Sequence, residues 1–215
     1  MGSQSDHAVA LLQDLIERGE LQPGTMVSER GLMEMTGLGR TPVREALQRL
    51  ALTHMLRIHP SKGIEIPDVS VENQLGGLEV RRAMEGLAVM LACQRATSKD
   101  FSDIAHMKAE LTGDFGLSAY IETVRQTHSL IIRAARNPYL EAALVPLQSL
   151  SRRFWIMHVR DEKQEIAAGK ALHEAILSAI VRRDTEAAHA ASLALNDYLV
   201  HFALATLPER VLRAN

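Results

Sequence analysis

The chain has 215 residues, of which 47% are hydrophobic, 23% charged and only 4% aromatic, and its formal net charge is -2 at pH 7. This composition is that of a folded globular chain and excludes a disordered one, and the near-zero charge excludes a protein that is basic throughout. Because the single cysteine, Cys93, cannot form a disulfide within the chain and no apolar run is long enough to span a membrane, we expect a cytoplasmic protein with no membrane partner.

The first 69 residues predict three helices followed by a β-hairpin. The helices are expected over residues 4–19, 28–36 and 41–53, where apolar residues recur at helical spacing. Ser28 is suited to cap the second helix, Thr41 is suited to cap the third, and Pro42 then takes its first position. Alternating polar and apolar residues on either side of a Pro/Gly turn predict a β-hairpin over residues 56–66.

The rest of the chain predicts helices alone. Residues 67–70 read as a linker. The helices after it are expected over residues 71–96, 98–112, 115–135, 138–158, 161–182 and 184–206. The sequence therefore predicts a mainly α protein with two domains, residues 1–69 and residues 70–215.

The second and third helices follow the helix-turn-helix pattern of DNA-binding proteins. They are short, a glycine-containing turn joins them, and the later one opens with the polar residues Arg40, Thr41 and Arg44. Arginine is the usual reader of guanine, and a threonine at a helix N-terminus suits a phosphate. At the hairpin tip, Lys62 and Gly63 form a short basic turn that suits a wing lying against the DNA backbone or minor groove.

The charge of this region changes sign along the chain. Residues 38–63 hold four arginines and one lysine against one glutamate, whereas residues 1–37 hold two arginines against six acidic residues. The acidic residues are therefore expected away from the reading helix. A solvated helix whose arginines form ordinary salt bridges is the alternative, but the turn, the spaced arginines and the basic hairpin together favour DNA binding.

Residues 21–66 resemble the winged-helix domain of GntR-type bacterial transcription regulators without a gap. The resemblance includes the Pro-Gly turn, the Ser-Glu helix opening, the run Arg-Thr-Pro-Val-Arg-Glu-Ala-Leu and the Pro-x-x-Gly wing. It implies a homodimer on a double-stranded, pseudo-palindromic DNA operator. It also implies the following DNA contacts: Arg30, Arg40, Thr41, Arg44, Lys62 and Gly63.

The second domain resembles the FCD ligand-binding domain of the FadR branch of these regulators. The matching segments are residues 79–97, 128–140 and 173–191. The resemblance implies an antiparallel, all-helical bundle that holds a small-molecule effector. In many members the bundle also holds a divalent metal through one aspartate and three histidines.

Two of the four metal ligands that the resemblance implies are missing. His128 and His173 match two of the histidines, but the positions of the other two ligands hold Val124 and Leu195. Because two imidazoles alone bind Zn, Ni or Mn weakly, we expect no metal cofactor. We expect the two histidines to donate hydrogen bonds to an anionic or polar effector instead. The alternative is that both are core histidines without a ligand.

Arginines of the second domain are candidates for binding a carboxylate, because a guanidinium pairs with a carboxylate in a fork. Adjacent arginines on a helix cannot both point into the bundle, so at most one of Arg152 and Arg153 should do so. For any one of these arginines taken alone, a surface or interface salt bridge is the default interpretation. The effector-binding candidates are Arg81, His128, Arg133, Arg152 and His173.

The sequence therefore predicts a ligand-responsive transcription regulator with DNA and a small-molecule effector as partners. It contains no glycine-rich phosphate loop, no G-x-S-x-G and no HExxH, so we do not expect an enzyme. Two alternatives remain: the same regulator with a divalent metal in the helical domain, and a helical metal-dependent enzyme with an accessory winged helix.

Overall fold

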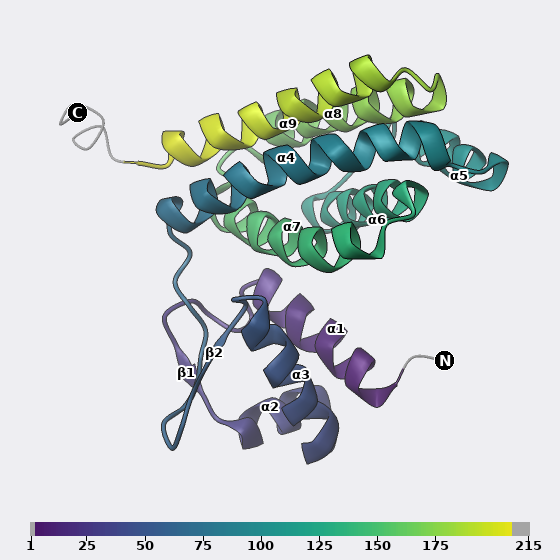
Figure 1. The fold of residues 1–215 in the computed structure, drawn as a ribbon. Helices are drawn as coiled ribbons and strands as arrows, with labels where there is room; N and C mark the ends of the chain where they lie inside the picture. Colours follow the sequence, from purple (N-terminus) through teal and green to yellow (C-terminus); the bar gives the residue numbers. More distant parts are fainter. Residues whose placement is uncertain (1–2, 208–215) are drawn as a thin grey trace. The chain divides into compact units, whose positions relative to one another are not determined.

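The computed structural model describes residues 3–207, and the chain forms two compact units (Figure 1). Unit 1 comprises Met1–Gln74 and Pro146–Met157, and unit 2 comprises Leu75–Val145 and His158–Asn215. This division differs from the expected single boundary at residue 69, because part of one late helix packs with the N-terminal residues. The outer ends of the two expected domains, residues 1–2 and 208–215, lie outside the described residues.

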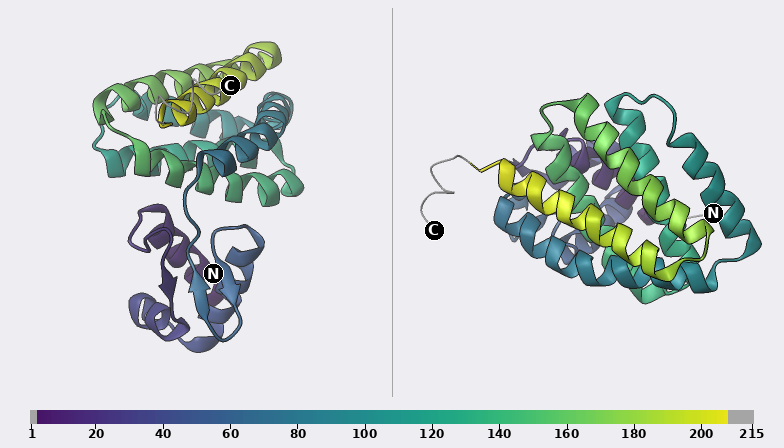
Figure 2. Two further views of the ribbon diagram at one scale, coloured as in Figure 1. Left: turned by 90° about the vertical axis from the view of Figure 1, so that its left-hand side faces the viewer. Right: turned by 90° about the horizontal axis from the view of Figure 1, so that it is seen from above.

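Unit 1 contains the predicted three helices and a small antiparallel sheet. The helices are α1 (Gln4–Glu17), α2 (Glu29–Thr36) and α3 (Arg40–Leu52), and the strands are β1 (Met26–Val27), β2 (Arg57–His59) and β3 (Gly63–Glu65). The hairpin strands β2 and β3 pair with Ile58 opposite Ile64, and β1 pairs with the other edge of β3 (Figure 2). The predicted winged helix-turn-helix is thereby confirmed, with β1 as an addition.

Local capping explains where these helices begin and end. Ser28 caps α2 as predicted, since its hydroxyl accepts a hydrogen bond from the Gly31 N–H. Gly37 ends α2 in the left-handed conformation, with φ of 67°, which glycine adopts at little cost. The prediction that Thr41 caps α3 is wrong: the N-cap is Gly39, in extended conformation, and Thr41 is already inside the helix.

Unit 1 has its own hydrophobic core. One face of each helix contributes to it, and the β3 side of the hairpin closes it. Its largest buried members include Leu12, Ile16, Leu32, Val43, Leu47, Leu50, Met55, Leu56, Ile64 and Ile66.

The remaining helices confirm the spans predicted for the second domain. They are α4 (Val71–Arg95), α5 (Ser98–Glu110), α6 (Leu117–Ala135), α7 (Pro138–His158), α8 (Glu162–Val181) and α9 (Thr185–Ala205). Helices α8 and α9 lie side by side and antiparallel, joined by a turn at residues 182–184 (Figure 2). Among the described residues, no helix is both long and apolar enough to cross a bilayer.

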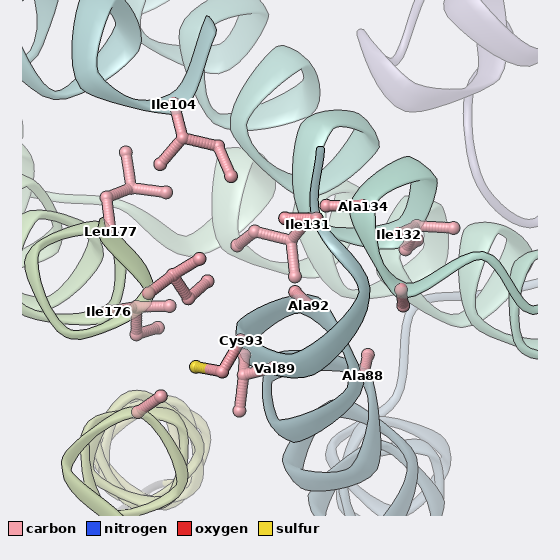
Figure 3. Packing of buried hydrophobic residues seen from close by; sticks show 14 of the residues in the cluster. Ala88, Val89, Ala92, Cys93, Ile104, Ile131, Ile132, Ala134, Ile176 and Leu177 are labelled. Atoms are coloured by element: carbon pink, nitrogen blue, oxygen red, sulfur yellow. The ribbon is translucent and has the colours of Figure 1, made fainter. Parts of the chain in front are cut away.

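Small side chains on α4 allow close packing in the core of unit 2 (Figure 3). Ala88, Ala92 and Cys93 are buried, and Ala92 lies near the larger Ile131 of α6 while Cys93 points towards Ile176 of α8. Burial raises the pKa of the Cys93 thiol above its ordinary value, which keeps it protonated and unreactive at neutral pH. Cys93 is therefore a small core residue.

Candidate functional site

The N-terminal end of α3 presents the predicted DNA-reading side chains to solvent. The side chains of Arg40 and Arg44 are 68% and 59% exposed, and Thr41 is exposed between them. The opposite face of α3 holds the helix in the core through Val43 and Leu47, which are buried. Because α-helical residues four apart share a face, packing of one face presents both guanidiniums on the other.

One carboxylate joins the two reading arginines. The Nε–H of Arg40 donates to Oε1 of Glu29 at 2.9 Å, and the Nε–H of Arg44 donates to Oε2 at 2.8 Å. The expectation that the acidic residues of the first 37 positions lie away from the reading helix is therefore wrong. Asp6 departs from it as well, since it accepts a hydrogen bond from Arg49 of α3.

The remaining DNA-contact candidates lie on α2 and on the wing. Arg30 is exposed on α2 and pairs with Glu34, one helical turn away, at 2.9 Å. Lys62 lies exposed in the turn between β2 and β3. Gly63 has φ of +113°, and a Cβ there would lie 2.9 Å from the Val27 carbonyl oxygen, so the wing requires glycine at this position. The structure thus brings a basic helix end, α2 and a basic wing into one unit.

Two buried imidazoles meet in the interior of unit 2. His128 of α6 and His173 of α8 are 7% and 4% exposed, and their Nε2 atoms are 3.2 Å apart. The Nδ1 of His173 lies 2.7 Å from the Gly169 carbonyl oxygen, which can only accept a hydrogen bond. We therefore assign the Nδ1–H tautomer to a neutral His173, so that His128 donates from its own Nε2.

Other polar groups lie close to this pair. The guanidinium of Arg81 is buried and donates from Nε and Nη2 to Oε1 of Glu85, at 3.2 and 2.8 Å. The charges of Glu85 and Arg81 both act on the pKa of His173, while burial, the largest influence, lowers that pKa. The Tyr120 hydroxyl lies directly against Gly169 of α8, one helical turn before His173. These groups form an interior polar cluster of Arg81, Glu85, Tyr120, His128 and His173.

Sequence reasoning missed two members of the interior polar cluster. Glu85 lies four residues after Arg81, and a Glu/Arg pair at that spacing is a readable signal because both side chains fall on one helix face. Tyr120 gave no local signal, since only the fold brings its hydroxyl to Gly169.

The donors of this cluster do not match the metal site that many FCD domains contain. Val124 and Leu195, at the two missing ligand positions, are both buried and have no donor atom. Within residues 3–207, no group of three or more histidine, cysteine, aspartate or glutamate side chains is placed to hold a metal ion. Two imidazoles 3.2 Å apart supply at most half of a four-ligand shell.

Two of the effector-binding candidates lie outside the interior polar cluster. Arg133 is half exposed and pairs with Asp103 and with the buried Asp100. Its position follows from helix geometry, because five residues after His128 is about 140° around α6. Arg152 belongs to unit 1 and donates to Glu17 of α1 at 3.2 Å. We leave both out of the effector site.

Arg152 and Arg153 both have hydrogen-bond partners in unit 1, which does not contradict the expectation that at most one of them points into the bundle. Both are buried, because each reaches a different partner in unit 1. Arg152 pairs with Glu17, while Arg153 donates to the Pro67 carbonyl oxygen at 2.9 Å.

Comparison with family models gives one match for each predicted domain. Residues 4–66 match the model described as bacterial regulatory proteins, gntR family. Residues 77–197, more than half of the chain, match the FCD domain.

The related proteins are named as transcription regulators, which agrees with the prediction of a regulator and not an enzyme. The HTH-type transcriptional regulator McbR of Escherichia coli is 32% identical over 101 residues, which cover 46% of this chain and 45% of that protein. An HTH-type regulator of Mycobacterium tuberculosis is 24% identical over 96% of this chain and 84% of its own length. The galactonate operon transcriptional repressor of Escherichia coli is 23% identical over 90% of this chain and 93% of its length.

Solved structures share the fold. The structure of Escherichia coli McbR/YncC aligns with a TM-score of 0.79 and 21% identity, covering 95% of this chain and 99% of that one. A GntR regulator from Rhodococcus aligns with a TM-score of 0.73 and 16% identity, covering 96% of this chain and all of that one.

Proposed function

Because the chain belongs to the GntR family of bacterial transcription regulators and carries an FCD domain, we propose that it binds a pseudo-palindromic operator as a homodimer. We also propose that a small carboxylate metabolite in the helical domain regulates this binding. Such a protein acts in the cytoplasm, where DNA is accessible. The observation that carries the DNA-binding role is the exposure of Arg40 and Arg44 at the N-terminal end of α3.

The DNA contacts that we propose involve exposed residues of unit 1. Arg40 and Arg44 are placed to read base edges in the major groove, and Thr41 is placed to hold a phosphate at the helix N-terminus. We assign contacts with the DNA backbone to Arg30 on α2 and to the wing residues Lys62 and Gly63.

Competition binding tests this role. A duplex selected by the protein from a randomised library is compared with random DNA, using wild type, Arg40→Ala, Arg44→Ala and the control Arg49→Ala. Each of the first two changes should cost ~1–3 kcal/mol of discrimination between the duplexes, because a bidentate base contact is lost. Arg49→Ala removes the same charge from the far half of α3 and should weaken both complexes alike. Equal wild-type affinity for selected and random DNA contradicts the proposal.

An apolar stripe on α4 supports the homodimer. Val80, Ala83 and Leu87 are exposed, and with the half-buried Met90 they recur at spacings of three and four residues. Such spacing places them on one helix face, as in helices that pack against a second helix. A second copy of this chain is the partner we propose, because a palindromic operator requires two reading helices.

The interior polar cluster supports a carboxylate effector. Burying an ion pair such as Arg81–Glu85 costs more than packing apolar residues of the same size, so its presence suggests a role in binding. A carboxylate effector is able to take a share of the Arg81 guanidinium, which offers five N–H donors. The charges of this pair act on His173, and the imidazoles of His128 and His173 can donate to a carboxylate by exchanging their mutual contact or the Gly169 contact for it.

Thermal melting with a panel of small carboxylates tests the effector site. A binder raises the melting temperature further as its concentration rises, with a logarithmic dependence, because only the folded state binds it. Arg81→Gln and His128→Gln should abolish the shift, whereas His106→Ala, at an exposed histidine of α5, should preserve it. A shift that both cluster variants retain contradicts this site.

The same samples test the expectation that no metal is bound. We propose that the helical domain acts without a metal, since Val124 and Leu195 replace two donors. Stoichiometric zinc, nickel or manganese in the purified protein would replace this proposal with the metal-containing regulator.

A further inference from the structure

Glu29 occupies a position that the DNA-binding proposal does not explain. It is the first residue of α2, yet its side chain accepts hydrogen bonds from two arginines of α3. The Glu29 side chain is 26% exposed, and those of Arg40 and Arg44 are more than twice as exposed. The carboxylate therefore lies underneath the two guanidiniums, on the protein side of the surface they form.

Both contacts use the same atom of each arginine. Arg40 and Arg44 donate through Nε, at 2.9 and 2.8 Å. A guanidinium has five N–H donors, so four on the terminal Nη1 and Nη2 atoms of each arginine remain for other acceptors. Guanine presents O6 and N7 side by side in the major groove, and a pair of terminal N–H groups matches them.

Two effects oppose this arrangement of the arginines, and Glu29 counteracts both. Arg40 and Arg44 are one helical turn apart, and like charges at that spacing repel each other. Long exposed side chains also lose rotamer entropy when they are held in one geometry. Hydrogen bonds from Arg44 and then from Arg40 lower the pKa of Glu29, so it is ionised at neutral pH and neutralises part of that repulsion.

We propose that Glu29 is a specificity-determining positioning residue: it holds the Nε atoms of Arg40 and Arg44 so that their terminal amino groups face the base edges. The inference rests on the proposed DNA-binding function and deepens it. Glu29 has a second effect of opposite sign, because a carboxylate near the phosphates weakens sequence-independent binding. Glu29 therefore lowers the affinity for DNA of any sequence and raises the discrimination between sequences.

The opposite signs make Glu29→Gln a sharp test. We expect its affinity for the wild-type-selected duplex to fall about tenfold while its affinity for random DNA stays equal or rises slightly. A new selection by Glu29→Gln from the randomised library should show weaker guanine preference. The matched control is Asp14→Asn, which removes the same charge from an exposed pair with Arg18 on α1 and should change neither result.

Glu29→Asp separates geometry from charge. It keeps the carboxylate but shortens the side chain by one methylene, so it should lose discrimination without gaining affinity for random DNA. Melting temperatures should stay near wild type, because exposed ion pairs contribute little to stability.

Several outcomes overturn the inference. If Glu29→Gln keeps the wild-type base preference, Glu29 does not position the arginines. If it binds both duplexes more tightly by the same factor, Glu29 only repels DNA. If wild type itself shows no preference, the proposed function fails first, and that result is distinguishable because it does not depend on any Glu29 variant.

Discussion

His173 of the interior polar cluster sets a pH limit on the stability of the helical unit. His173 is buried, and its Nδ1–H donates to the Gly169 carbonyl oxygen, a contact that offsets part of the effect of burial on its pKa. Burial lowers the pKa of His173 below its ordinary value of 6.5. Near pH 6.5 the unfolded chain therefore binds a proton at His173 that the folded chain does not bind. The contribution of His173 to the free energy of unfolding is fully present above this pH and is lost as the pH falls below it.

His173→Gln should reduce this pH dependence. The glutamine does not titrate, so the free energy of unfolding should fall less between about pH 7 and about pH 5 than in wild type. Urea unfolding at the two pH values measures the difference. The control His106→Gln, at an exposed position, should keep the wild-type dependence. Equal slopes for wild type and His173→Gln would show that folding does not lower the pKa of His173.

Lys62 on the wing should contribute charge without sequence preference. The residue is exposed at the turn between β2 and β3, where a lysine meets a phosphate as a point charge. Lys62→Ala should weaken binding to selected and random DNA alike and lower the salt slope by about one, because one fewer counterion is released. Fluorescence anisotropy over a range of salt concentrations measures the slope. Lys163→Ala, at an exposed lysine of α8, should leave it unchanged, and an unchanged slope for Lys62→Ala excludes the phosphate contact.

Among the helices, Gly169 shows how close α6 and α8 approach. A Cβ built at this position of α8 would lie 1.9 Å from the hydroxyl of Tyr120, which is buried. The aromatic ring therefore rests on bare backbone one turn before His173. Gly76 offers the contrast, since it is also inside a helix and a Cβ there meets no atom within 4 Å.

Gly169→Ala and Gly76→Ala should consequently change stability in opposite directions. Gly169→Ala forces Tyr120 to move and should cost ~1–3 kcal/mol, because overpacking a core shifts side chains and backbone. Gly76→Ala should add ~0.5–1 kcal/mol through helix propensity alone. Chemical unfolding measures both. Recovery in the double variant Gly169→Ala, Tyr120→Phe would identify the hydroxyl as the clashing group, and a neutral Gly169→Ala would contradict the close approach.

Helices and strands were predictable where a local sequence pattern extends over enough residues. They were not predictable where the segment is too short to show a pattern or where its structure depends on distant residues. The helices follow from apolar periodicity over many residues, and the hairpin from alternation around its Pro/Gly turn. Strand β1 has only two residues, which cannot show an alternation. The sequence predicts Thr41 as the cap of α3 because its hydroxyl is able to accept a hydrogen bond. The helix instead begins after Gly39, which caps it without any side-chain hydrogen bond.

At the scale of the chain, the sequence predicts two domains but not the contacts between residues far apart in it. Glu17 and Arg152 are 135 residues apart, and both are buried in unit 1, where Ser149 also donates to Glu17. Nothing in the sequence around either residue signals this pair. For the same reason Glu29 was counted with a distant acidic segment, although it contacts both reading arginines. Local patterns identified the arginines, and only the fold shows what holds them.

The α4 stripe makes assembly of the whole molecule testable. Leu87 is 41% exposed near the centre of the stripe, and Val181 at the end of α8 is 39% exposed outside it. Leu87→Asp should lower the dimer fraction, because pairing two copies would bury two unpaired carboxylates, whereas Val181→Asp should not.

Analytical ultracentrifugation of both variants at several protein concentrations measures this change. Operator affinity should fall with the dimer fraction of Leu87→Asp and recover at high concentration, since two linked reading heads bind a palindrome far more tightly than one. Unchanged dimer mass in Leu87→Asp would assign the interface to another face. A stable dimer with normal operator affinity in both variants would leave the α4 stripe without a role in assembly.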